Sequence, residues 1–478
     1  MQFNSYIFIL VYLPIVIIGY FGLNRISLVA SKLFLIVTSA IFYVYGGKDI
    51  AIILAASIAV NYFLAVVINN TGRLLWGGVL LNVALLFYFK YFNFFISNVN
   101  NAFQKDFTLK EIILPLGISF FTFQQIMYLV NVYKKNIEKV HLLDYLAYIL
   151  YFPKLLMGPI VEPTELISQI NDPELHYIKW DNISYGIKIF SFGLFKKMIL
   201  ADTFSKAVAW GYANVDAATS MDWFLVMLFY TFEIYFDFSG FCDMAVGVST
   251  MLNINLPINF DSPYKALSIR DFWKRWHISL TGFLTRYVYI PLGGSKKGKV
   301  RTYINTMIVF VVSGIWHGAN WTFVLWGVLH GLLSVLDRIF DKTKKKLNEV
   351  VKWSTTFFAV NILWLLFRSE SITQWRYILI KICSFQSTAV SDGLIDSFIL
   401  PETPFLLKIL HMEILNANVR GLSLLLFIVT AFAICLIPDN NYNKLKNNNW
   451  ITLVLAAVAF VWSFLCLSSE SIFVYFNF

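Results

Sequence analysis

The sequence predicts an all-α polytopic membrane protein, one integral membrane domain over residues 1–478 with about ten to twelve transmembrane helices. Of the 478 residues, 58% are hydrophobic and only 14% are charged, whereas a soluble protein carries about 25% charged residues. Several apolar runs reach the roughly 20 residues that a helix needs to cross a bilayer. The polar connections between these runs are too short to fold as a separate soluble domain.

The first apolar run, MQFNSYIFILVYLPIVIIGYFGL, predicts a retained helix over residues 5–23. It lacks the basic segment and the small-residue cleavage site of a signal peptide. Further apolar runs follow along the chain, and the longer ones have room for two helices each. They are 28–46, 49–68, 74–98, 112–130, 142–158, 185–210, 222–252, 303–336, 354–368, 371–383, 421–437 and 450–468.

Positive charge is concentrated in residues 253–302, which hold nine Lys or Arg and two Asp in a chain of net charge +10. The positive-inside rule places this basic segment in the cytoplasm, where it would also suit an anionic, phosphate-bearing ligand. Nucleic acid is not expected as a partner of so apolar a chain. With Met1 outside, simple alternation would put the basic segment outside. We therefore expect a re-entrant or split run within 185–251, near Lys196 and Lys197, because charges at mid-bilayer are costly.

Residues 256–301 are too polar to span a membrane. Ser268 is a predicted N-cap for a helix that continues through Thr285. The pattern predicts an amphipathic surface or re-entrant helix. Its apolar face would carry Phe272, Trp276, Leu280 and Phe283, and another face Lys274 and Arg275.

Three of the six histidines lie in apolar or basic helical segments: His277, His317 and His330. Their spacing excludes the helical zinc pattern HExxH, and no Glu or Cys accompanies them at ligand spacing, so we expect no metal site. A neutral imidazole with an ordinary pKa of about 6.5 is a natural general base near neutral pH. These residues are therefore candidates for proton transfer.

The surroundings of His317, in SGIWHGANW, indicate a lined cavity. Gly314 and Gly318 permit a locally opened helix or a close backbone approach. Asn320 adds a donor and an acceptor, and Trp316 and Trp321 would form rigid walls. The alternative is a structural histidine that is hydrogen-bonded between helices, since buried polar groups must be satisfied.

Two carboxylates, Asp237 and Asp243, lie in the apolar stretch YFDFSGFCDM. They could orient a histidine, or they could form buried ion pairs with Lys196, Lys197 or Arg275. The sequence leaves both interpretations open.

Three stretches together resemble the membrane-bound O-acyltransferases, most closely the bacterial branch that includes the alginate O-acetylation protein. They are YFDFSGFCDMAVGVSTMLNINLPINFDSPY at 235–264, SIRDFWKRWHISLTGFLTRYVYIPLGGSKKGK at 268–299 and SGIWHGANWTFVLWGVLHG at 313–331. The opening segment and YFPKLLMGPIVEP at 151–163 are also similar to that branch. The core motifs thus span 235–331, whereas the C-terminal helices expected in 354–478 resemble the family only in hydropathy.

The resemblance implies a helical bundle with a central funnel or tunnel. An acyl-CoA donor, here acetyl-CoA, would enter from the cytoplasm, and an acceptor hydroxyl on a polysaccharide or partner protein would enter from outside. His317 matches the catalytic histidine of the family's WHG motif, and His277 matches the second motif position. His330 matches a recurring LHG-like position to which we assign no role.

The expected mechanism makes His317 the general base that takes the proton of the attacking hydroxyl. Exclusion of water would suppress hydrolysis of the thioester. Oxyanion donors would come from Asn320, His277, Trp316 or Trp321. Phosphate-binding cations at the cytoplasmic mouth would be Lys274, Arg275, Arg286, Lys296 and Lys297.

Two other functions remain compatible with the composition. One is a transporter or channel in which the histidines relay protons, and the other is a non-catalytic scaffold of a polysaccharide export complex. The resemblance favours the enzyme, which would need no permanently bound cofactor and would lie in the bacterial cytoplasmic membrane. It also implies an extracytoplasmic SGNH-hydrolase-like acetyltransferase as partner, or a polysaccharide as direct acceptor.

Overall fold

The computed structural model describes residues 1–68, 72–341, 346–400, 416–439 and 449–467, together with 402, 408, 409, 445, 446 and 473. Within these residues every regular element is an α-, 3₁₀- or π-helix. The sole strand-like feature there is an isolated antiparallel bridge between Phe260 and Trp276. The all-α prediction is confirmed.

The chain forms two compact units that interleave along the sequence. Unit 1 comprises Met1–Leu194, Phe241–Ile258 and Tyr442–Phe478, and unit 2 comprises Phe195–Gly240 and Asn259–Asn441. Helix α12, Ser220–Met251, contributes residues to both units. The prediction of a single membrane domain stays a prediction.

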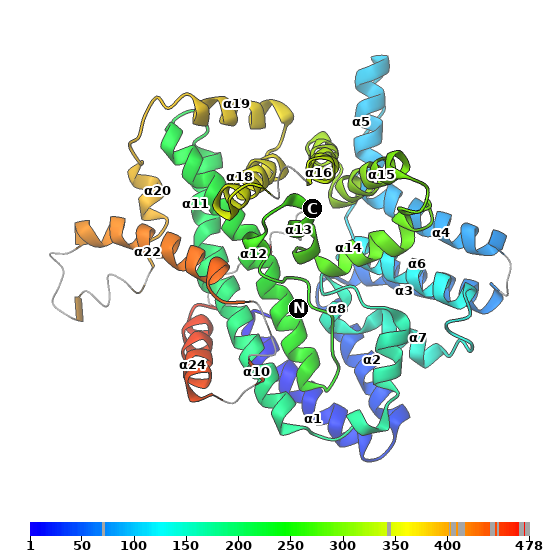
Figure 1. Ribbon diagram of the computed structural model, residues 1–478. Coiled ribbons are helices and arrows are strands. Elements are labelled where there is room, and N and C mark those ends of the chain that lie inside the picture. The colour runs from blue at the N-terminus through cyan, green and yellow to red at the C-terminus, as the bar shows by residue number, and fades with distance from the viewer. Residues whose placement is uncertain are drawn as a thin grey trace. The chain divides into compact units, whose positions relative to one another are not determined.

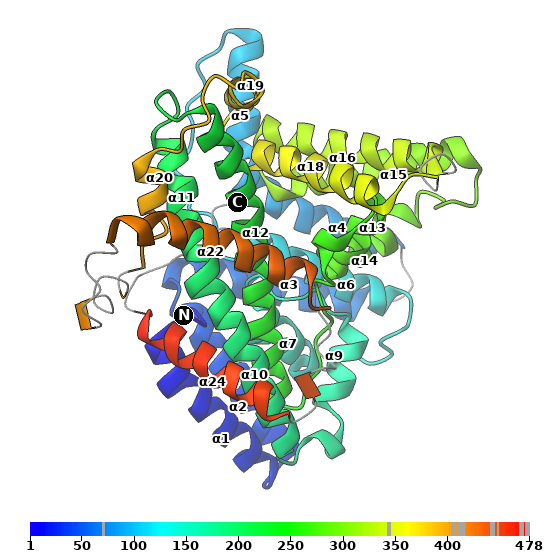
Figure 2. The same ribbon diagram turned by 60° about the vertical axis from the view of Figure 1, so that its left-hand side comes forward.

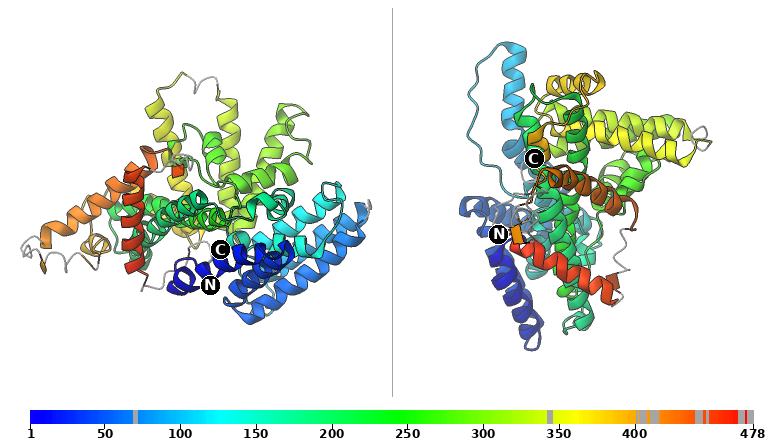
Figure 3. Two further views of the ribbon diagram at one scale, coloured as in Figure 1. Left: turned by 90° about the horizontal axis from the view of Figure 1, so that it is seen from below. Right: turned by 90° about the vertical axis from the view of Figure 1, so that its left-hand side faces the viewer.

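Unit 1 is built from pairs of neighbouring helices, among which α1 packs on α2 and α4 packs on α6. After α5 the chain runs back alongside that helix (Figure 3), where Asn100 and Asn93 bond to the backbone of Phe107 and Lys110. Its elements are η1 (Phe8–Tyr12), α1 (Leu13–Asn24), α2 (Leu28–Val44), α3 (Lys48–Val67), α4 (Gly72–Leu86), η2 (Phe87–Tyr91), α5 (Phe92–Phe103), α6 (Ile118–Tyr133), α7 (Leu142–Leu150), α8 (Phe152–Leu155), α9 (Pro163–Ile170), η3 (Pro173–Leu175), most of α10 (Trp180–Phe195) and α24 (Trp450–Leu465).

Unit 2 holds His277, His317 and His330, and its helices α15 and α16 pack closely on one another. In Figures 1 and 2, α15 and α18 each lie beside α16. The elements are η4 (Lys196–Ala201), α11 (Asp202–Ala213), η5 (Pro263–Lys265), α13 (Ile269–Arg275), α14 (Ile278–Leu284), η6 (Thr285–Tyr289), α15 (Lys299–His317), α16 (Trp321–Ile339), α18 (Glu349–Arg368), α19 (Ile372–Cys383), α20 (Asp392–Asp396) and α22 (Asn416–Leu436).

Five described helical segments are long and apolar enough to cross a membrane: Ile50–Val67, Gly72–Phe103, Ser220–Met251, Trp321–Ile339 and Glu349–Arg368. Four shorter apolar helices, Phe8–Asn24, Leu28–Val44, Arg420–Leu436 and Trp450–Leu465, accompany them. The predicted run 303–336 contains parts of two helices, since the chain leaves the helix at Gly318 and re-enters it at Trp321.

The run 185–210 changes helix type at the predicted position, near Lys196 and Lys197. Residues Lys196–Ala201 form a π-helical turn between α10 and α11, so the helix is altered there but does not end. Lys197 is buried, and its ammonium lies 2.8 Å from the Asp237 carboxylate and 2.9 Å from that of Asp202. The predicted pairing of Asp237 with Lys197 is therefore confirmed, and it compensates a charge that burial alone would make costly.

Candidate active site

The basic segment forms two short helices where the sequence predicted one. Ser268 caps α13 as expected, because its hydroxyl accepts a hydrogen bond from the Asp271 amide. The predicted continuation through Thr285 is wrong: α13 ends at Arg275 and α14 begins at Ile278. His277 lies in the break with φ of 45°, in the left-handed region.

An extended segment on the other side of the bridge explains this break. The Asp261 amide donates to the Arg275 carbonyl at 2.9 Å, and the Ile278 amide donates to the Asn259 carbonyl at 3.0 Å. The Asn259 side-chain oxygen also accepts from the amide and the hydroxyl of Ser279. These bonds hold His277 in a conformation that costs about 1–3 kcal/mol for a residue other than glycine, and such strained conformations cluster at active sites.

The His277 imidazole is 1% exposed, and within the described residues neither ring nitrogen has a hydrogen-bond partner. Its ring packs edge-on against Phe238, with centroids 4.7 Å apart, and lies 6.3 Å from Trp316. Burial lowers the pKa of His277 to about 3. The ring is therefore neutral at physiological pH and has one N–H available as a donor.

His317 is the last residue of α15 and is 4% exposed. Its ring packs against Trp326 at 5.2 Å and Phe367 at 5.3 Å. One turn earlier, a Cβ on Gly314 would collide with the Phe323 carbonyl of α16. The close backbone approach predicted for the glycines beside His317 is confirmed at Gly314.

The aromatic rings join the three histidines into one cluster. Trp316 is 5% exposed and contacts both His277 and His317. Trp326 lies against His317 on one side and, at 4.6 Å, against His330 on the other. Residues forty and more positions apart in sequence thus share one buried site.

The structure does not place Asn320 and Trp321 as the donor and the wall of a cavity around His317 that the sequence predicted. Asn320 caps α16 by accepting from the Thr322 amide, and its NH₂ group donates to the Glu370 carbonyl at 2.9 Å. Trp321 is 54% exposed, so it does not close a buried cavity around the imidazole. Helix α16 begins at Trp321, and the Asn320 side chain connects residues 318–320 to Glu370, just after α18.

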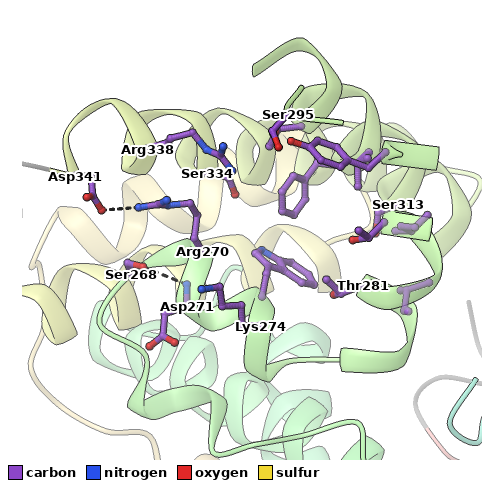
Figure 4. Close-up of a pocket in the computed structure, with 18 residues that line it drawn as sticks. Ser268, Arg270, Asp271, Lys274, Thr281, Ser295, Ser313, Ser334, Arg338 and Asp341 are labelled. Carbon is purple, nitrogen blue, oxygen red and sulfur yellow. Dashed lines mark hydrogen bonds and ion pairs between the residues drawn. The ribbon is translucent and has the colours of Figure 1, made fainter. Parts of the chain in front are cut away.

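A pocket of about 690 Å³ in unit 2 adjoins the histidine cluster through Trp273, which lines the pocket and packs on His330. Figure 4 shows the residues that line this pocket. It combines a charged side with an apolar, aromatic side, and its walls come from α13 to α16. They comprise Ser268, Arg270, Asp271, Trp273, Lys274, Leu280, Thr281, Leu284, Thr285, Tyr289, Ser295, Thr306, Val309, Phe310, Ser313, Ser334, Arg338 and Asp341.

The charged side of the pocket has an excess of positive charge. Arg270 is compensated by Asp337 and Asp341, whereas Lys274 and Arg338 form no ion pair with any described residue. The buried Ser334 hydroxyl beside them likewise has no partner in the described part of the chain. Two cations and a hydroxyl of this kind suit an anionic, phosphate-like group.

Of the five cations predicted from the sequence, Lys274 alone lines this pocket. Arg275 is paired with Asp271 at 3.0 Å, and Arg286, Lys296 and Lys297 are exposed elsewhere on the basic segment. The sequence analysis missed Arg338 and Ser334. A helical signal was present, because Trp326, His330, Ser334 and Arg338 recur every four residues on one face of α16.

The pocket and the histidine cluster follow one another along α15. Thr306, Phe310 and Ser313 line the pocket, and His317 is one helical turn beyond Ser313 on the same face. At 1.5 Å per residue, Thr306 and His317 are separated by roughly 16 Å along the axis. A ligand that is anchored on the charged side would need a long arm to reach His317.

Comparison of the whole sequence defines the class of protein. Residues 39–372 match the model of MBOAT, the membrane-bound O-acyltransferase family. The chain belongs to this family, and it is a multi-pass membrane O-acyltransferase.

Curated relatives fall into three groups of named activity. The peptidoglycan O-acetyltransferase of Helicobacter pylori is 35% identical over 100% of this chain and 97% of its own length. The protein of Pseudomonas aeruginosa named "Probable alginate O-acetylase AlgI" is 35% identical over 79% of this chain and 74% of its own. The teichoic acid D-alanyltransferase of Bacillus subtilis is 26% identical over 61% of this chain and 75% of its own length.

These matches favour the acyltransferase prediction over the transporter and scaffold alternatives. They also extend the similarity into the C-terminal part of the chain, where the sequence by itself indicated hydropathy alone. The names of these relatives share acyl transfer and refer to peptidoglycan, alginate and teichoic acid.

Proposed function

We propose that this protein transfers the acetyl group of cytoplasmic acetyl-CoA to a hydroxyl outside the cytoplasmic membrane of a bacterium. The observation that carries the proposal is the position of His317, buried in the aromatic cluster one helical turn from a pocket with uncompensated cations. The long donor molecule has phosphates at one end and a reactive thioester at the other, which matches the separation of these two features along α15.

His317 acts as the general base. As the acceptor oxygen attacks the thioester carbonyl, His317 takes the hydroxyl proton, and a C–O bond forms. The C–S bond then breaks, and the proton passes from His317 to the CoA thiolate. His277 is neutral, fixed by its backbone and free of competing hydrogen bonds among the described residues, so its N–H suits the developing oxyanion.

Lys274 and Arg338 hold the donor phosphates on the charged side of the pocket. Of the cations expected from the sequence only Lys274 is kept, and Arg338 of α16 is added to it. The Ser334 hydroxyl adds a neutral donor at the same place.

The acceptor is a cell-envelope glycan, and the peptidoglycan backbone is the first candidate. The H. pylori relative named for peptidoglycan matches this chain from end to end, whereas the alginate-named P. aeruginosa relative matches 79% of it. A partner acetyltransferase of the SGNH-hydrolase kind, which would carry acetyl from this protein to the glycan, is the alternative acceptor.

The test is the His317→Ala variant, purified in lipid nanodiscs and supplied with radiolabelled acetyl-CoA and acceptor. We expect acetyl transfer to fall by about 10²–10⁴-fold, the usual contribution of a positioned general base. His141→Ala is the matched control, because His141 is exposed at the start of α7. Transfer at the wild-type rate by a His317→Ala protein with the wild-type melting temperature would refute the proposal.

A further inference from the structure

Trp273 belongs both to the wall of the pocket and to the histidine cluster. Its indole forms part of the pocket wall, and the same ring packs against Trp326 at 5.6 Å. Trp326 is in turn the ring that packs on His317. Trp273 is only 7% exposed, so the indole fills this position.

His330 fixes the orientation of that indole. The Trp273 N–H donates to Nδ1 of His330 at 3.2 Å, and the two rings meet edge-on with centroids 5.0 Å apart. His330 is fully buried. Because a protonated imidazole has hydrogens on both nitrogens and cannot accept, this bond requires the neutral ring with its proton on Nε2.

We infer that His330 is a positioning residue that holds Trp273 in the wall shared by the pocket and the histidine cluster, so that water does not reach His317 alongside the donor's arm. The inference rests on the proposed function. A thioester beside a general base can react with water, giving acetate and CoA thiol, or with the acceptor hydroxyl, giving the acetyl ester and CoA thiol. In both reactions the base takes a proton from oxygen, so the enzyme favours the ester only if water is kept out.

The first test compares hydrolysis with transfer. Purified protein is supplied with acetyl-CoA, and release of CoA thiol is measured without and with acceptor. In Trp273→Ala and His330→Leu we expect the ratio of hydrolysis to transfer to rise by about fivefold or more, the factor that corresponds to one lost neutral hydrogen bond. His330→Gln keeps an acceptor for the indole N–H, and its ratio is expected to stay near wild type.

Two controls separate exclusion of water from simple damage to the fold. Trp375→Phe removes an indole N–H that bonds to the Ile362 carbonyl on a partly exposed helix of the same unit, and it should leave the ratio unchanged. If the Trp273 and His330 variants lower hydrolysis and transfer in parallel, their role is structural and the inference is wrong.

A second test requires no acyl transfer at all. Diethyl pyrocarbonate modifies accessible imidazoles, and the rate at which it labels His317 can be followed by mass spectrometry of the peptide. We expect slow labelling in wild type and in His330→Gln, and labelling about fivefold faster in Trp273→Ala and His330→Leu. Equal labelling in all four proteins would overturn the inference, whereas a wild type that labels slowly but never transfers acetyl would overturn only the proposed function.

Discussion

His277 combines a strained backbone with a buried ring that is unsatisfied among the described residues, and each property has a cost. The left-handed conformation is maintained by the bonds of Asn259 and Asp261 to the neighbouring backbone. The buried imidazole gives up its hydration without gaining a described hydrogen bond. A residue with both costs is explained more readily by chemistry than by stability.

The lowered pKa of His277 makes a prediction about acid stability. The folded-state pKa is about 3, below the unfolded value of about 6.5. The unfolded state therefore binds the proton more readily, and stability is lost as pH falls below 6.5. Between pH 7 and pH 5 the wild type should lose about 2 kcal/mol through this group, and His277→Asn should not.

The measurement is the melting temperature in detergent at both pH values. The decrease on acidification should be smaller in His277→Asn than in wild type, and His141→Asn, which changes an exposed ring, should behave like wild type. The same decrease in all three proteins would show that His277 is not buried as a neutral group.

At the level of elements, the α15–α16 pair positions both His317 and the pocket. The two backbones approach closely at Gly314 and Gly327, where each glycine faces the backbone of the other helix. Side chains at these positions would separate the helices and move His317 relative to Trp326.

Gly314→Ala should therefore destabilise the protein by about 1–3 kcal/mol, the usual range for overpacking, and should lower acetyl transfer as well. Gly282→Ala is the contrasting substitution, because a methyl group there meets nothing within 4 Å. In α14 it should be neutral or stabilise by about 0.4–1 kcal/mol. The measurement is the melting temperature of each variant. Equal melting temperatures would show that Gly314 is not needed for the close packing of α15 on α16.

Local patterns in the sequence predicted where helices lie and begin better than where they are interrupted. Ser268 was predicted as an N-cap because capping depends on neighbouring residues alone. The end of α13 at Arg275 was missed, because the backbone of Asn259 and Asp261, distant in sequence, replaces the helical hydrogen bonds there. Periodicity contains no information about such pairing.

Local sequence patterns likewise predicted some residues of the candidate active site and missed those that only tertiary packing brings there. His317 and His277 stand out as polar residues in unusual surroundings, and the structure places both in one cluster. Asn320 has the residue type of an oxyanion donor but is used as a helix cap. Arg338 resembles an ordinary charge at the end of a helix until α13 is packed against it, so tertiary packing was needed to find it.

At the scale of the whole molecule, the two units interleave along the sequence, so segments that are distant in sequence stabilise the same unit. Unit 1 takes its helices from the beginning, the middle and the end of the chain. Phe241 is stacked on Phe3 at 5.0 Å and meets Phe473 edge-on at 5.1 Å. Three segments distant in sequence thus share one aromatic contact.

Phe473→Ala should consequently destabilise unit 1 although the family match ends at residue 372. Phe473 is fully buried, and loss of a buried Phe costs about 3 kcal/mol or more. Phe103, 69% exposed in the same unit, provides the matched control, and Phe103→Ala should melt like wild type. A Phe473→Ala protein with unchanged melting temperature would show that this part of the chain is dispensable.

The contact of Phe241 with Phe473 also has a consequence for biogenesis. The ribosome adds Phe473 long after Phe3 and Phe241, so this aromatic contact of unit 1 stays incomplete until residue 473 has been synthesised. A nascent chain that stops before residue 473 would leave the Phe241 ring without this edge-on contact.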